Sequence, residues 1–189
     1  DTTFWKDKNE KRENNRILFI GNDGKRDYDF AIELANKLRN FEFIFVTNKI
    51  LQSPDLPPNI KLHNGSWHEN LLTDSDIKNL YSSSYLTIIP LKESLQPSGQ
   101  SVALQSMSCG TPVMITKTKG FWEIEKFEDR KNIFFVSKNE ISIWESNIIN
   151  FFQNYKNDKN LRQNIIQTIE ENYSLEKFNS EIEKIIFSY

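Results

Sequence analysis

The sequence predicts an α/β protein built on a three-layer, doubly wound parallel sheet of the Rossmann-like type. Runs of four apolar residues recur along the chain, as in 17–20 and 43–46, and such runs are typical of strands that are covered on both faces. Between these runs lie segments with apolar residues at helical spacing, for example from Ala31 to Leu38. Strands that alternate with helices form βαβ units, and these units build a parallel sheet.

The strands and helices follow one another in a regular order. Strands are predicted at 17–20, 43–46, 60–62, 86–89, 112–115 and 133–136. The first helix has Asp27 near its start, and the second begins at 73–76 with an inner face that includes Tyr81. A third helix runs from about Gly99 to Ser108, and helical patterns at 144–155, 161–169 and 175–185 complete the chain.

Length and composition exclude several classes of protein. A chain of 189 residues is long enough for one domain whose core needs no disulfide. The net charge of −2 argues against a nucleic-acid partner. The single cysteine, Cys109, excludes an internal disulfide, so we expect a cytoplasmic protein. No apolar run approaches the roughly 18 residues of a membrane span.

The chain divides into a tail and a domain. Residues 1–16 are polar apart from Phe4 and Trp5, and we interpret them as a linker or tail whose two aromatic residues dock on the body. Residues 17–189 carry all the predicted strands and helices. Because the chain begins at Asp1 and not at methionine, we expect it to be a piece of a longer protein.

Ligands of doubly wound sheets bind beyond the carboxyl ends of the strands, so the first loop to consider is 21–26. Its two glycines let the backbone turn sharply and approach a ligand, and Lys25 and Arg26 would suit a phosphate. The spacing matches neither G-x-G-x-x-G nor a Walker A loop. The alternative is an ordinary tight turn with two solvated basic residues.

The loop after the third strand, 65–69, contains Trp67. An exposed tryptophan there could stack on a nucleobase, and the alternative is that it packs on the edge of the domain. His63 and His68 are the two histidines, and their spacing matches no zinc pattern, so no metal site is expected.

The loop after the fourth strand runs into a helix through Pro97, Ser98 and Gly99. The first helical turn has unpaired backbone N–H groups, which favour an anion, on Gln100, Ser101 and Val102. Gln105 lies one turn further along on the same side as Ser101 and could bond a hydroxyl. The alternative is a plain crossover helix capped by Ser98. After the fifth strand, Lys117 and Lys119 could add charge to the same cleft.

The segment 96–113, QPSGQSVALQSMSCGTPV, resembles the donor-site segment of the family-four retaining glycosyltransferases, which commonly reads E-x7-E-A-M-A-x-G-x-P-V. The run 17–28 resembles the glycine turn after the first strand of their C-terminal domain, and 76–90 resembles their D-x-x-x-L-Y…P segment. The match covers residues 17–186 in order. The resemblance implies the C-terminal half of an enzyme with the GT-B fold, the half that binds the nucleotide sugar.

The resemblance also implies roles for individual residues. Gly21 would be the glycine of the first turn, and Arg26 would be the catalytic basic residue that grips the diphosphate, with Lys25 as the second candidate. Backbone amides at 100–102 would meet the phosphates, and Gln105 would hold the ribose hydroxyls. The chain departs from the pattern at three positions: Asn22 replaces a basic residue, and the two glutamates fall on Pro97 and Gln105.

The activity implied is that of a hexosyltransferase-type enzyme, which moves a sugar from a nucleoside diphosphate sugar to a glycan, lipid or other acceptor. We expect a role in bacterial polysaccharide biosynthesis, without a metal or cofactor. The partners implied are the nucleotide-sugar donor and an acceptor-binding N-terminal domain that this chain lacks, which leaves room for peripheral membrane association through that domain. The isolated piece should then bind donor without turnover. The alternatives are a sugar-nucleotide epimerase-like enzyme, and a non-catalytic binding or scaffold domain, which Pro97 and Gln105 favour.

Overall fold

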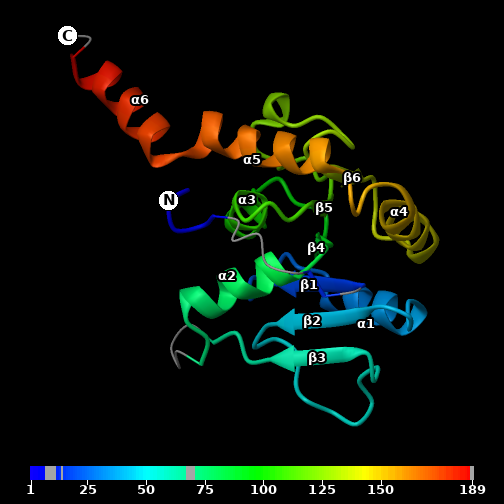
Figure 1. The fold of residues 1–189 in the computed structure, drawn as a ribbon. Helices are drawn as coiled ribbons and strands as arrows, with labels where there is room; N and C mark the ends of the chain where they lie inside the picture. The colour runs from blue at the N-terminus through cyan, green and yellow to red at the C-terminus, as the bar shows by residue number, and fades with distance from the viewer. Residues whose placement is uncertain (7–11, 14, 67–70, 188–189) are drawn as a thin grey trace.

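The computed structural model of the chain describes residues 1–6, 12–13, 15–66 and 71–187. Its strands form a six-stranded parallel sheet in the order β3-β2-β1-β4-β5-β6 (Figure 1). They are β1 (Arg16–Ile20), β2 (Glu42–Val46), β3 (Ile60–His63), β4 (Leu86–Ile89), β5 (Val113–Thr116) and β6 (Phe134–Val136). The doubly wound parallel sheet expected from the sequence is therefore confirmed.

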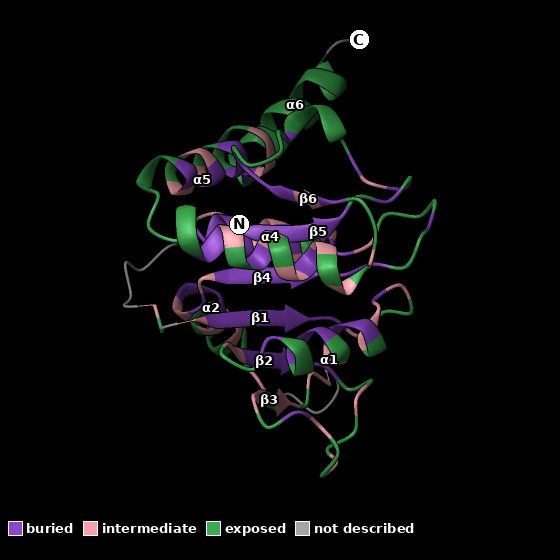
Figure 2. Ribbon diagram, turned by 90° about the vertical axis from the view of Figure 1, so that its right-hand side faces the viewer, coloured by how far each residue is buried: buried purple, intermediate pink, exposed green. Residues whose placement is uncertain are grey.

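Helices cover both faces of this sheet and complete three layers. They are α1 (Tyr28–Lys37), α2 (Asp74–Ser83), α3 (Gln100–Ser108), α4 (Ile141–Asn154), α5 (Lys159–Tyr173) and α6 (Leu175–Phe187), with a 3₁₀ turn, η1 (Ile124–Lys126). α1 and α4 lie on one face, whereas α2 and α3 lie on the other and α5 packs on α3 (Figures 1 and 2).

The strands are apolar because both of their faces are covered. Every residue of β1, β4 and β5 is buried, as the purple strands at the centre of Figure 2 show. The edge strand β3 is only partly buried, and accordingly its apolar residues alternate with polar ones. The continuous apolar runs in the sequence thus mark the centre of a parallel sheet.

The strand order places a topological switch point between β1 and β4. The two strands pair in parallel, Ile17 with Leu86 and Leu18 with Thr87. The chain leaves β1 toward β2 and β3, and then returns through α2 to β4 on the other side. In doubly wound sheets the crevice beyond the carboxyl ends of two such strands is the usual ligand site.

The N-terminal segment contacts the domain. The ring of Trp5 packs edge-on against Tyr81 of α2 at 6.0 Å, and Phe4 packs against Trp5 at 4.9 Å. Ser108 of α3 donates a hydrogen bond to the Trp5 carbonyl, and Arg12 donates one to the Gly110 carbonyl at 2.8 Å. The two aromatic residues therefore dock on the body as the sequence suggested.

The last helix, α6, is formed as predicted but packs differently from the others. None of its described residues is buried, and Phe178 is 59% exposed. Figure 2 shows it extending away from the sheet. Among the described residues, no helix combines the length and the hydropathy needed to span a bilayer.

Candidate functional site

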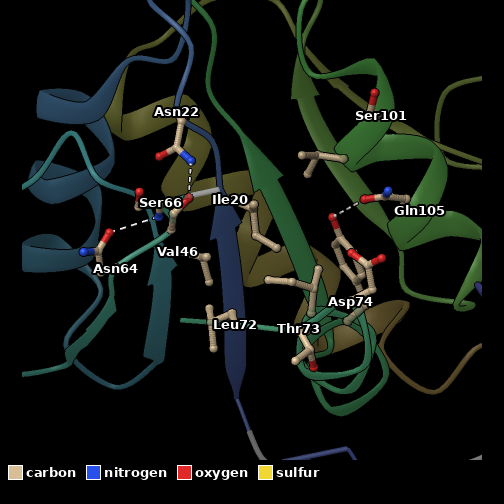
Figure 3. A pocket seen from close by; sticks show the side chains of 14 residues that line it. Ile20, Asn22, Val46, Asn64, Ser66, Leu72, Thr73, Asp74, Ser101 and Gln105 are labelled. Atoms are coloured by element: carbon tan, nitrogen blue, oxygen red, sulfur yellow. Dashed lines mark hydrogen bonds between the residues drawn. The ribbon is translucent and has the colours of Figure 1, made fainter. Parts of the chain in front are cut away.

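A cavity of about 460 Å³ lies beyond the carboxyl ends of β1, β2 and β3, between α2 and α3 (Figure 3). Ile20, Val46 and Ile77 give it an apolar floor, and polar groups from the surrounding loops and helix ends form its rim. Its size is that of sites for small organic ligands. The cavity therefore lies beside the switch point, on the side of β1, β2 and β3, with α3 as its wall on the β4 side.

The loop after β1 is tied to its neighbours by Asn22. The side-chain amide of Asn22 donates to the Gly65 carbonyl at 2.6 Å, and its oxygen accepts from the Asn48 N–H at 2.8 Å. Three loops are joined in this way, those after β1, β2 and β3. Asn22, the residue that departs from the basic one of the resembled family, is therefore a structural link at the rim of the cavity.

Arg26 lies beneath this loop. Its side chain is 2% exposed, and Nη1 donates both to Asp23 Oδ2 and to Ser98 Oγ at 2.8 Å. Burial lowers the pKa of Arg26, whereas the Asp23 carboxylate raises it, and an arginine with such a partner keeps its charge. Gly21 is required here because a Cβ on it would lie 2.6 Å from the Arg26 Nε.

Arg26 consequently joins the loop after β1 to the loop after β4, at the switch point. The sequence suggested a basic residue free to meet a ligand from the opposite side, but Arg26 is not among the described residues that line the cavity. No hydrogen bond between described residues uses its Nη2.

The start of α3 is built on Gly99. Its φ of +79° is a left-handed conformation that favours glycine, and an added Cβ would lie 2.8 Å from the Cγ2 of Ile89. The same Cβ position lies 3.3 Å from Arg26 Nη1, so the guanidinium sits directly behind the helix end. Among the described residues no side chain caps this helix.

The interpretation that Ser98 caps the helix is therefore wrong. The N-cap is Gly99, because the Ser98 hydroxyl is engaged elsewhere, accepting from Arg26 and donating to Asp23 Oδ2 at 3.0 Å. The amides that follow, on Gln100, Ser101 and Val102, are left without a side-chain cap in the described part of the chain. Ser101, Val102 and Gln105 line the cavity together, as their spacing predicted.

The opposite wall of the cavity is the start of α2. Thr73 and Asp76 form a capping box there: the Asp76 N–H donates to Thr73 Oγ1 at 3.2 Å, and the Thr73 N–H donates to Asp76 Oδ2 at 2.8 Å. The hydrogen bonds from Thr73 hold the pKa of Asp76 below its usual value. With Asp74 also lining the cavity, this wall carries negative charge.

The loop after β5 packs against the loop after β4. The Gly120 N–H donates to the Ser94 carbonyl at 2.9 Å, and the Lys119 N–H donates to the Glu93 carboxylate at 3.0 Å. Lys117 lies over the ring of Phe135 at 5.2 Å. Neither lysine is among the described residues that line the cavity.

Lys25 and Trp67 were also predicted as site residues. Lys25 is half-buried, and its backbone N–H donates to Asp23 Oδ1 at 2.8 Å, but it does not belong to the described lining of the cavity. Trp67 lies outside the described residues. The described residues contain no group of three or more histidine, cysteine, aspartate or glutamate side chains that could hold a metal.

Sequence reasoning missed several residues of the site, among them Tyr81, which lines the cavity, and Asp23, which holds Arg26. Asp23 holds Arg26 in place, and Tyr81 reaches from α2 to Gln105, where its hydroxyl donates to Oε1 at 3.3 Å. Asp23 and Arg26 are three apart in a polar loop, which on sequence alone indicates a solvated pair. The apolar spacing of α2 placed Tyr81 in the core, and its hydroxyl was the only signal of a polar role.

Comparison with known proteins gives a family and a fold. Residues 14–154 match the family model described as "Glycosyl transferases group 1". No curated protein matches the chain.

Among solved structures, Anabaena HepE in complex with UDP and glucose is 16% identical, with a TM-score of 0.71 over 93% of this chain and 49% of that chain. A glycosyltransferase from Rickettsia africae is 19% identical, with a TM-score of 0.73 over 98% of this chain and 55% of that chain. The C-terminal domain of LpcC, a glycosyl transferase group 1 family protein from Francisella tularensis, is 16% identical, with a TM-score of 0.71 over 93% of this chain and 98% of that chain.

The chain thus spans about half the length of the Anabaena and Rickettsia proteins and nearly the whole of the isolated C-terminal domain. At these identities the likeness establishes the fold.

Proposed function

Because this chain belongs to the group 1 glycosyl transferases, we propose that it is the donor-binding domain of a retaining glycosyltransferase. The domain holds a nucleoside diphosphate sugar, and its sugar is transferred to an acceptor bound by another part of the parent enzyme. The proposal rests on the family match, and the geometry of the cavity supports it.

The start of α3 carries the proposal. Its first amides have no side-chain cap among the described residues, and Gly99 supplies the left-handed turn with which the helix begins. The helix dipole and these N–H groups together favour an anion at this end. A diphosphate placed here would reach the cavity along Ser101, Val102 and Gln105.

Arg26 supplies the charge behind this end. Departure of the nucleoside diphosphate builds negative charge on the phosphates, and fixed donors stabilise that charge in the transition state. Arg26 is held by Asp23 and Ser98, so it needs little reorganisation, and its charge would act on the phosphates from behind the start of α3. We propose that this charge replaces a metal.

The nucleoside would fill the remainder of the cavity, with the ribose beside Gln105. The solved structures of Anabaena HepE and of the pneumococcal O-GlcNAc transferase GtfA contain UDP, so we take uridine as the first base to test. The apolar floor from Ile20 and Val46 suits a base or ribose ring.

The sugar would be held differently from the family pattern. Pro97 has no polar side-chain atom where that pattern has glutamate, and Glu93 is bonded to the Lys119 N–H. We propose that backbone groups of the loop 94–99 replace the missing carboxylate for a hexosyl donor. The acceptor, a glycan or lipid in polysaccharide synthesis, would bind to a separate domain in the bacterial cytoplasm or at the membrane surface.

The test is calorimetric titration of the chain with UDP, GDP and ADP, each with and without Mg²⁺. We expect one base to be preferred, with an affinity that does not require the metal. A folded sample that binds none of the three would contradict the proposal and favour a non-catalytic scaffold, the alternative that Pro97 and Gln105 support. Binding that depends on Mg²⁺ would overturn the metal-independent part alone.

A further inference from the structure

The side-chain amide of Gln105 has a defined orientation in the cavity. Its oxygen, Oε1, accepts a hydrogen bond from the Tyr81 hydroxyl at 3.3 Å. Figure 3 shows the amide oxygen on the side of this bond and the nitrogen on the far side. No hydrogen bond between described residues uses the nitrogen, Nε2, so it is the polar atom of Gln105 that is left for a ligand.

Tyr81 is fixed strongly enough to impose this orientation. It is completely buried, its ring packs edge-on against Trp5 at 6.0 Å, and its carbonyl accepts from Thr111 Oγ1 at 2.7 Å. Burial raises the pKa of the Tyr81 hydroxyl, which therefore keeps its proton and acts as a donor. A flipped amide would leave that proton without an acceptor in a buried place, which is costly.

We propose that Tyr81 acts as a positioning residue that makes Gln105 a hydrogen-bond donor toward the ligand, so that this part of the site selects an acceptor atom. The inference rests on the proposed function, in which the ribose lies beside Gln105. A glutamate at this position, as in the resembled family, can only accept when it is ionised. Here the polarity is reversed, and a ribose hydroxyl meets Gln105 through its oxygen and not through its proton.

Fluorinated nucleotides distinguish the two polarities. Fluorine accepts a hydrogen bond weakly and cannot donate one, whereas hydrogen in the same position neither accepts nor donates a hydrogen bond. The chain would be titrated with UDP, with 2′-deoxy-UDP and 2′-fluoro-2′-deoxy-UDP, and with the corresponding 3′ pair. Loss of the hydroxyl should weaken binding about two- to tenfold at the position that faces Gln105, as expected for one hydrogen bond.

In the wild-type chain we expect the fluoro nucleotide to bind more tightly than the deoxy nucleotide at that position. In Gln105→Glu the order should reverse, because the carboxylate repels fluorine. Both affinities come from the same variant, so any general effect of the added charge on the diphosphate cancels in their ratio. A wild-type chain that binds fluoro nucleotides no better than deoxy nucleotides at both positions would overturn the proposal.

Tyr81→Phe tests the positioning role, because it keeps the ring and removes the hydroxyl. The amide is then free to turn, and the preference for fluorine should shrink while thermal unfolding shows a folded chain. An unchanged preference would overturn the role of Tyr81. Failure of UDP itself to bind the wild-type chain would contradict the proposed function instead, so the two ideas can fail separately.

Discussion

The two helices that flank the cavity begin in different ways. α2 satisfies its own first amides through the Thr73–Asp76 capping box and places carboxylates in its first turn. α3 begins at a left-handed glycine, has no acidic residue in its first turn, and is not capped by any described side chain. The first amides of α2 have a side-chain partner in the capping box, whereas those of α3 have none among the described residues. The cavity therefore has a negative wall and a positive wall, and these would orient a ligand that is anionic at one end.

The largest effect is expected from Gly99→Val. A β-branched side chain in the left-handed region costs about 1–3 kcal/mol, and overpacking against Ile89 adds about 1–3 kcal/mol. The side chain would also displace Arg26 and distort the first turn of α3, so UDP binding should fall below what calorimetry detects. The matched control is Gly24→Ala, since a Cβ on Gly24 meets nothing within 4 Å. A folded Gly99→Val chain that binds UDP normally would show that α3 is not the anion site.

Arg26→Ala should have the next largest effect. Removing the arginine should weaken UDP binding by about 1.5–3 kcal/mol, the size of a hydrogen bond to a charged group, and Asp23 would keep its hydrogen bond from Ser98 but lose its ion-pair partner. Titration with UDP measures this loss, and urea unfolding shows whether the variant remains folded. Lys25→Ala is the control, because Lys25 precedes Arg26 and carries the same charge, but only the Arg26 side chain bonds Asp23 and Ser98. Equal affinity of the wild-type chain and a folded Arg26→Ala chain would remove Arg26 from the site.

The smallest effect, and the most direct test of the comparison, comes from making α3 resemble α2. Ser101→Asp adds an acid to the first turn, which should stabilise the chain by about 0.3–1 kcal/mol and weaken UDP binding by a similar amount. The reciprocal Asp74→Ser change in α2 should lower stability without weakening UDP binding. Urea unfolding would measure the change in stability of each variant, and calorimetry would measure the change in its affinity for UDP. If Ser101→Asp left the affinity unchanged, the negative charge of the ligand would lie elsewhere.

Most of the fold could be predicted from the sequence because its strands are buried on both faces. Short apolar runs such as Ile17–Ile20 are typical of central strands in a parallel sheet. The structure places each predicted strand within a residue or two of its expected position. The rule that ligands bind beyond strand ends then selected the loops that meet at the cavity. The pattern of α6 was equally regular, but periodicity alone did not show that its apolar face would lie exposed.

The site was predicted less completely because its decisive contacts join distant residues. Ser98 meets Arg26 across 72 positions, and this contact joins the buried arginine to the residue before the glycine cap of α3. Tyr81 meets Gln105 across 24 positions. No local pattern encodes either pair, so the sequence indicated which loops would matter but not which of their side chains would be engaged with each other.

The docking of the N-terminal segment has a consequence for how the chain reaches its final structure. Trp5 accepts from Ser108 across 103 residues, and Arg12 donates to Gly110 across 98. Contacts of such separation form late, because closing a long loop costs entropy before any contact compensates for it. At a synthesis rate of about 5–20 residues per second, Ser108 is synthesised on the order of ten seconds after Trp5. Of the residues in this chain, those synthesised first are therefore among the last to form their native contacts.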